Sequence, residues 1–182
     1  MYTIDTTNNV ILFAYKRDDI FDDVRHLSTF MAKNAVSKEG QPLLEQFSIT
    51  EDEEPMFMLC LRDCLPDVWE VMVKLTHGVE EPYKSDEEYD TDTTVGDITF
   101  TADTPYVTFR LVNNGAYNPN LLTIVDSSIR STMEQGVLEK WYTRIAQGDL
   151  LKVAQVGWAS ETSSLARRLM QLLRKSVYPP VS

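Results

Sequence analysis

The side chains in this sequence best suited to metal binding or catalysis are two cysteines and two histidines. Cys60 and Cys64 are four residues apart, so both thiols lie on one side of a helix if this segment is helical. A zinc site would need two more ligands, and neither His26 nor His77 sits at a recognisable spacing for one. We therefore expect two buried, reduced cysteines. The histidines are expected at the surface or at a helix end.

Patterns typical of an active site are missing from the rest of the sequence. No Gly-X-Ser-X-Gly run surrounds a nucleophilic serine, and the seven glycines are scattered singly, so no glycine-rich loop binds phosphate. The aromatic residues are not interleaved with basic ones, as they are in single-strand nucleic-acid binding. The sequence therefore predicts a protein that is not an enzyme, with no catalytic residue, cofactor or metal, and no sequence-specific nucleic-acid binding.

Acidic residues cluster in two places. Thr50 and Glu53 match a capping box, and residues 51–54 fall where a helix dipole favours negative charge. Residues 79–94 are strongly acidic and nearly free of aliphatic side chains, which predicts a loose loop. Four carboxylates in this loop have spacings like those of calcium ligands: Asp86, Glu88, Asp90 and Asp92. The central glycine and closing glutamate of a calcium loop are missing, so calcium is not expected, and binding of another ion stays open.

The net charge of −11 is unevenly spread along the 182 residues. Residues 1–104 hold 23 Asp and Glu against 8 Lys and Arg, whereas residues 105–182 hold 5 against 9. Phosphate binding needs a concentrated positive face, which this distribution does not favour. The asymmetry suits head-to-tail packing of identical copies, in which the negative side of one copy meets the positive side of the next. An equally good explanation is that the acidity keeps the protein in solution.

The hydrophobic pattern predicts a single domain of the mainly helical α+β class, a helical bundle with one β-hairpin and an N-terminal extended segment. In chain order we expect an extended arm or strand (1–18), N-terminal helices (19–77), the acidic loop (79–94), the hairpin (96–112), a C-terminal helix pair (119–175) and a tail (176–182). The hairpin rests on alternating apolar and polar residues on either side of a turn signal at 103–105. An isolated hairpin is marginal in water, so it must lie on the helices or pair with another strand.

Three local signals refine the helices. Pro66 predicts either two helices or one kinked helix over residues 51–77. Asn118 and Pro119 predict the start of a helix that is apolar on several faces, which is typical of the central helix of a bundle. Small residues around Trp158 predict close helix packing there. No apolar run approaches the roughly 18–20 residues of a membrane span, and the first residues do not resemble a signal peptide, so we expect the protein in the cytosol where it is made.

Five segments carry a resemblance to a known family. They are Ile49-Thr50-Glu51-Asp52-Glu53, Val68-Trp69-Glu70-Val71, Val107-Thr108-Phe109-Arg110-Leu111, Leu138-Glu139-Lys140-Trp141-Tyr142, and the basic Leu169-Met170-Gln171-Leu172-Leu173-Arg174-Lys175 that precedes two prolines. In this order they resemble small neck or tail structural proteins of tailed phages and prophages of Bacteroidales-type bacteria, grouped with head–tail connectors. The resemblance covers roughly residues 45–178.

The resemblance implies a virion protein, made in the bacterial host cytoplasm, that forms an oligomeric ring under the portal. Its partners would be further copies of itself, the portal and other neck or tail proteins, and the family has no catalytic residues to carry over. At the interfaces we expect Tyr83, Tyr89, Phe100, Tyr106, Phe109, Arg110, Arg167, Arg168, Arg174 and Lys175. The alternative is an acidic protein-binding module, such as a DNA-mimic-like inhibitor of a host or phage protein.

Overall fold

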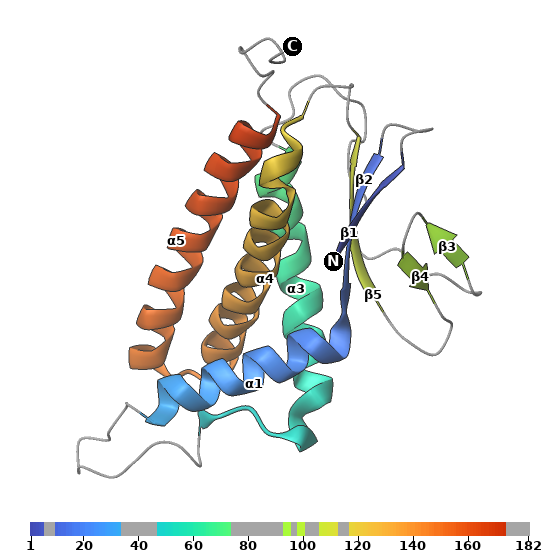
Figure 1. The fold of residues 1–182 in the computed structure, drawn as a ribbon. Helices are drawn as coiled ribbons and strands as arrows, with labels where there is room; N and C mark the ends of the chain where they lie inside the picture. Colours follow the sequence, from blue (N-terminus) through green and yellow to red (C-terminus); the bar gives the residue numbers. More distant parts are fainter. Residues whose placement is uncertain are drawn as a thin grey trace, which may run out of the picture.

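The chain forms a group of helices packed against one face of a three-stranded antiparallel sheet (Figure 1). The computed structural model describes residues 1–5, 10–33, 47–73, 93–95, 98–100, 106–112 and 117–173. Its helices are α1 (Arg17–Lys33), α3 (Glu54–Val73), α4 (Leu122–Arg144) and α5 (Gly148–Leu172), with short 3-10 turns η1 (Glu51–Glu53) and η2 (Pro119–Leu121). The strands are β1 (Tyr2–Asp5), β2 (Val10–Lys16), β3 (Thr93–Val95), β4 (Ile98–Phe100) and β5 (Tyr106–Val112). The predicted class, mainly helical α+β, is confirmed.

Helix α4 is the central helix of the fold. It packs against α5, α3 and α1, and Figure 1 shows α3, α4 and α5 running side by side with α1 crossing them at one end. Its buried residues lie on several sides of the helix, as the sequence predicts. At its start the side chain of Asn118 accepts a hydrogen bond from the backbone N–H of Asn120 (3.2 Å), with Pro119 at the first position of η2. The predicted cap is confirmed.

Helix α3 is a single helix that continues through Pro66. Of the two predictions for this segment, one helix is therefore confirmed over the described residues. Before α3, the Glu53 carboxylate accepts a hydrogen bond from the backbone N–H of Thr50 (2.8 Å), which is one half of the predicted capping box. Glu53 thus has a structural role at the start of this helix.

Strand β2 lies in the middle of the sheet, between β1 and β5. Its side chains from Val10 to Tyr15 are all buried, so the strand is covered on both faces. Phe13 lies opposite Phe109 in the register of β2 and β5, and both side chains belong to the core shared with the helices. The Tyr15 hydroxyl donates a hydrogen bond to the backbone carbonyl of Asp126 in α4 (2.9 Å). The sheet is thereby fixed to the central helix.

The prediction of a β-hairpin over residues 96–112 is wrong. Strand β4 pairs with β3, and β5 pairs along its full length with β2, nearly a hundred residues earlier in the chain. The physical reason is burial. Strand β2 is the most apolar strand, and pairing with the seven residues of β5 covers far more of its apolar surface than pairing with the three residues of β4 would. The N-terminal segment, predicted as an arm or a strand, contributes two strands to the sheet.

Strands β3 and β4 lie on the side of the three-stranded sheet that faces away from the helices (Figure 1). The predicted acidic loop ends on β3, and its residues 79–92 lie outside the described residues, as does the predicted tail over 176–182. Across the described parts of the chain, no helix is long and apolar enough to cross a membrane.

Candidate interaction surface

The inner face of α5 packs tightly on α4. A Cβ atom added at Gly136 of α4 would lie 2.8 Å from the ring of Trp158 and 3.1 Å from the Cβ atom of Cys64. The first distance is shorter than real Cβ contacts and the second is tight, so the glycine lets the indole ring lie directly on the backbone of α4. At the adjacent residues, the side chain of Gln135 of α4 lies over Gly157 of α5. The predicted close packing around Trp158 is confirmed.

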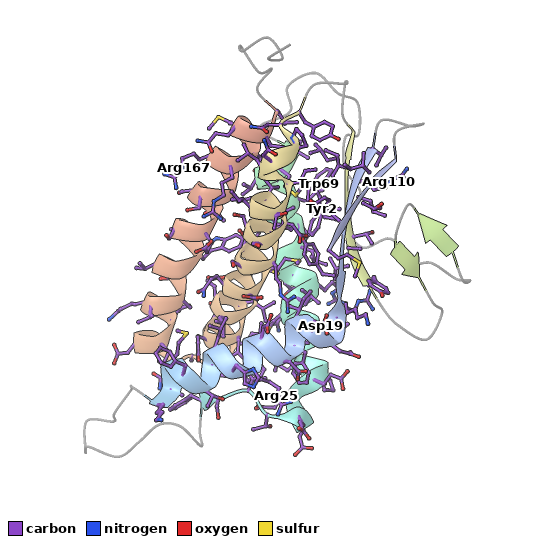
Figure 2. All side chains as sticks on the ribbon, in the orientation of Figure 1. Tyr2, Asp19, Arg25, Trp69, Arg110 and Arg167 are labelled. Atoms are coloured by element: carbon purple, nitrogen blue, oxygen red, sulfur yellow. The ribbon has the colours of Figure 1, made fainter. Side chains whose placement is uncertain are left out.

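The outer face of α5 carries apolar side chains that no described element covers. Val153, Val156 and Met170 are 58%, 72% and 46% exposed. Between them the face is lined by exposed small residues: Ala159, Ser160 and Ser163. Figure 2 shows Arg167 on this outer side, pointing away from the bundle, and Lys152 is also exposed at the N-terminal end. We call the side chains of residues 152, 153, 156, 160, 163, 167 and 170 the α5 face.

The outer side of α1 is acidic at one end and apolar at the other. Asp18, Asp19 and Asp22 are exposed in its first turns, and Phe30 is 67% exposed in its last turn. His26 is exposed between them. We call the side chains of residues 19, 22, 26 and 30 the α1 face.

A cluster of three charged groups holds α1 against α4. The Arg130 guanidinium of α4 donates through Nε to the Asp23 carboxylate of α1 (2.8 Å) and to Glu134 (3.2 Å), and through Nη2 to the backbone carbonyl of Asp19 (3.3 Å). Glu134 is the most buried of these side chains. Sequence reasoning missed this cluster. Arg130 and Glu134 are four residues apart on one helix, but nothing in the sequence links them to a carboxylate 107 residues earlier.

The pKa of Glu134 is raised from 4.5 to about 7, first by burial and then by the neighbouring Asp23 carboxylate, while Arg130 opposes both. Glu134 therefore changes charge near neutral pH. Because the cluster joins α1 to α4, protonation of Glu134 removes repulsion between two carboxylates at this junction. Chemically, the cluster is a pH-sensitive contact between helices.

A polar hollow of about 440 Å³ lies between α1 and the segment that leads into η1. It is lined by Arg25, His26, Thr29, Ser48, Ile49, Thr50, Glu51 and Asp52. The Arg25 guanidinium in this hollow already pairs with Asp22 (3.3 Å) and Glu51 (3.1 Å) and lies over the ring of Phe21. The positive charge of Arg25 is therefore already paired with carboxylates of the same chain.

Cys60 and Cys64 are free, buried thiols on α3, as predicted. Burial raises the pKa of the Cys60 thiol to about 11, partly opposed by the nearby Arg144, and raises that of Cys64 further still. Thiols that stay protonated at neutral pH are poor nucleophiles and poor metal ligands. Within the described ranges, no three His, Cys, Asp or Glu side chains converge in a way that could hold a metal ion.

The predicted interface residues whose side chains the structure describes lie on two elements, β5 and α5. Phe109 is completely buried in the core, so its assignment to an interface is wrong: the strand turns this side chain toward the helices. Tyr106 and Arg110 are half-buried on β5, and Figure 2 shows Arg110 on the side of the sheet away from the helices. Arg167 is exposed, whereas Arg168 donates a hydrogen bond to the Ser128 hydroxyl of α4 within the chain.

The other predicted interface residues cannot be placed. The described residues do not include Tyr83, Tyr89, Arg174 and Lys175, and of Phe100 only the backbone, in β4, is described. Sequence reasoning also missed Val153 and Val156. Their signal is visible in the sequence, because they lie on the opposite side of the helix from Ala154, Leu165 and Leu169, which form the buried stripe.

Comparison of the chain with protein-family models, with curated proteins and with solved structures finds no match.

Proposed function

We propose that this protein is a structural component of a tailed-phage particle, which assembles with copies of itself in the neck or tail and connects the portal to the tail. The observation that carries the proposal is the exposed apolar pair Val153 and Val156 on the α5 face, with Met170 exposed further along it. Val153, Val156 and Met170 lie on the outer side of a helix whose inner side is fully packed. Exposed apolar surface of this kind marks contacts between proteins.

The distribution of charge supports assembly from identical copies. Exposed carboxylates of Asp18, Asp19 and Asp22 lie on α1, while the exposed cations Lys152 and Arg167 lie on α5. Opposite charges on different faces of one molecule favour head-to-tail contacts, which close into rings when the rotation between copies allows. The sequence resembles head–tail connectors, which form rings under the portal. This resemblance is the reason for proposing that the chain assembles in the neck or tail.

Native mass spectrometry and electron microscopy of the purified full chain test this proposal. The chain is measured by itself and mixed with the portal and tail proteins encoded by neighbouring genes. We expect a closed oligomer, and a complex with at least one of these proteins. A strict monomer that binds neither portal nor tail proteins would contradict the proposal.

A second candidate function is an acidic module that occupies the DNA-binding surface of another protein. Exposed carboxylates of Glu51, Asp52 and Glu54 at the start of α3 favour it, together with those of α1. The test is competition: the chain should displace DNA from a phage or host DNA-binding protein, and the triple variant Glu51→Gln, Asp52→Asn, Glu54→Gln should lose this effect. Displacement that is unchanged in the variant would contradict a role for this surface.

A further inference from the structure

We propose that the α5 face of one copy binds the α1 face of a second copy, with the two helices antiparallel. This inference rests on the proposed function, since it names the surfaces through which the chain would assemble. A second copy of this chain is the partner that would cover the α5 face. The contact is heterologous, because it joins two different faces and leaves one of each free at the ends of a pair.

The first argument is that the two faces have the same spacing. On the α5 face, the exposed apolar Val156 and the exposed cation Arg167 are eleven residues apart. On the α1 face, the exposed carboxylate of Asp19 and the exposed ring of Phe30 are also eleven residues apart. Eleven residues span about 16.5 Å and about three full turns of a helix. Each pair therefore lies along one line on its helix, and the two lines have the same length.

The second argument is the order of the chemistry along each helix. Between residues 156 and 167, α5 runs from an apolar residue to a cation, whereas between residues 19 and 30, α1 runs from a carboxylate to an apolar ring. When the helices are antiparallel, Phe30 lies over Val156 and Asp19 lies opposite Arg167. A parallel arrangement would put the carboxylate on the valine and leave the arginine against the ring. Antiparallel packing thus satisfies the apolar contact and the charge contact together.

The third argument concerns the residues between these ends. In the antiparallel alignment the middle of the α5 face presents Ser160 and Ser163, which are small and exposed, to His26 and the preceding turn of α1. Small side chains allow two helices to approach closely, and Ser160 can exchange a hydrogen bond with the imidazole. The aliphatic stem of Lys33 lies over Val153 in the same alignment, which covers the second exposed valine.

Two variants that each damage one face test the inference in the full chain. Val156→Glu puts a carboxylate in the centre of the apolar contact on α5, and Phe30→Glu does the same on α1. Both sites are exposed, so the variants should keep the circular dichroism spectrum and melting temperature of the wild type. Ile124→Glu is the matched control, because Ile124 is an exposed apolar residue of α4 outside both faces.

Sedimentation velocity and native mass spectrometry of wild type, each variant and their equimolar mixture give the readout, at concentrations up to about 1 mM. We expect the wild type and Ile124→Glu to form oligomers, and each face variant by itself to associate at least about 100-fold more weakly. The mixture should form a 1:1 heterodimer and nothing larger, because Val156→Glu keeps an intact α1 face and Phe30→Glu keeps an intact α5 face.

Charge exchange gives a second test with the same readout. Arg167→Glu should weaken association, and adding Asp19→Lys to the same chain should restore it, because the exchanged charges again attract across the contact.

Three outcomes would overturn the inference. If Phe30→Glu still dimerises while Val156→Glu does not, and the mixture gives no heterodimer, α5 packs on α5 of the second copy instead. If the wild type forms oligomers and both face variants match it, the contact lies elsewhere, while the proposed assembly stands. If the wild type stays monomeric at every concentration, self-assembly itself fails and both proposals fail with it.

Discussion

Replacement of Glu134 by glutamine should make the protein more stable at neutral and alkaline pH. The pKa of this carboxyl group is about 7 in the folded chain, against 4.5 for the ordinary side chain. The folded state therefore holds the proton more tightly, so stability is fully present below about pH 4.5 and is lost as the pH rises through 7. The difference between the two pKa values corresponds to about 3 kcal/mol. Glutamine is neutral at every pH and can donate to Asp23 while it accepts from Arg130, so it mimics the protonated acid.

Urea unfolding of wild type and Glu134→Gln, followed by circular dichroism from about pH 4 to about pH 8, measures this effect. Contributions from groups distant from Glu134 are common to both chains and cancel in the difference. We expect the two proteins to be of similar stability at the acid end, and the variant to be more stable by about 2–3 kcal/mol at the alkaline end. Glu54→Gln, at an exposed site, is the control and should change the free energy of unfolding by only about 0.5 kcal/mol or less. A difference between wild type and Glu134→Gln that is constant with pH, or a variant that is less stable at pH 8, would refute this reasoning.

Three further predictions concern packing and the buried thiols. Gly136→Ala should lower the free energy of unfolding by about 1–3 kcal/mol, because the new methyl group meets the Trp158 ring. The matched variant Gly157→Ala meets only the flexible end of Gln135, so it should be neutral or slightly stabilising. Equal stability of the two variants would contradict this prediction. Tyr15→Phe should cost about 0.5–1.5 kcal/mol in urea unfolding through loss of the hydrogen bond to the Asp126 carbonyl, and an unchanged midpoint would argue that this bond is absent. Cys60 and Cys64 should resist alkylation by iodoacetamide at pH 8 in the folded chain and react after unfolding in urea, as measured by mass spectrometry. Rapid labelling of the folded chain would show that the thiols are accessible.

The sequence was sufficient to predict the helices, because their signals are local. The apolar positions of α4 recur around a 23-residue helix, and Asn118 and Pro119 mark its start, so both its limits and its central position followed from the pattern. The same holds for the class of the fold and for the packing around Trp158. In each helix the buried side chains recur with a period of about 3.6 residues, and this pattern can be recognised without knowing how the helix packs.

The strand pairing could not be predicted, because its partners are far apart in the sequence. Strand β5 follows a turn signal at 103–105 that favours a local hairpin, yet it pairs with β2 near the start of the chain. The choice depends on how much apolar surface each pairing buries, which is a property of the whole core. The contact of Asp23 with Arg130 could not be predicted either, because the two residues are 107 positions apart in the sequence. The prediction that Phe109 lies at an interface was wrong, because the sequence does not show whether an aromatic residue on a strand lies in the core or on the surface.

Mass spectrometry of purified virions is the most direct test of the central claim, that this chain is a structural component of a phage particle. Particles from an induced culture of the strain that carries the gene are purified by density gradient, and their proteins are quantified against the portal protein. The account predicts that the chain is present in the particles in a fixed ratio to the portal, close to that of one ring to another. Its presence in the lysed cells together with its absence from particles that contain the portal would contradict the claim.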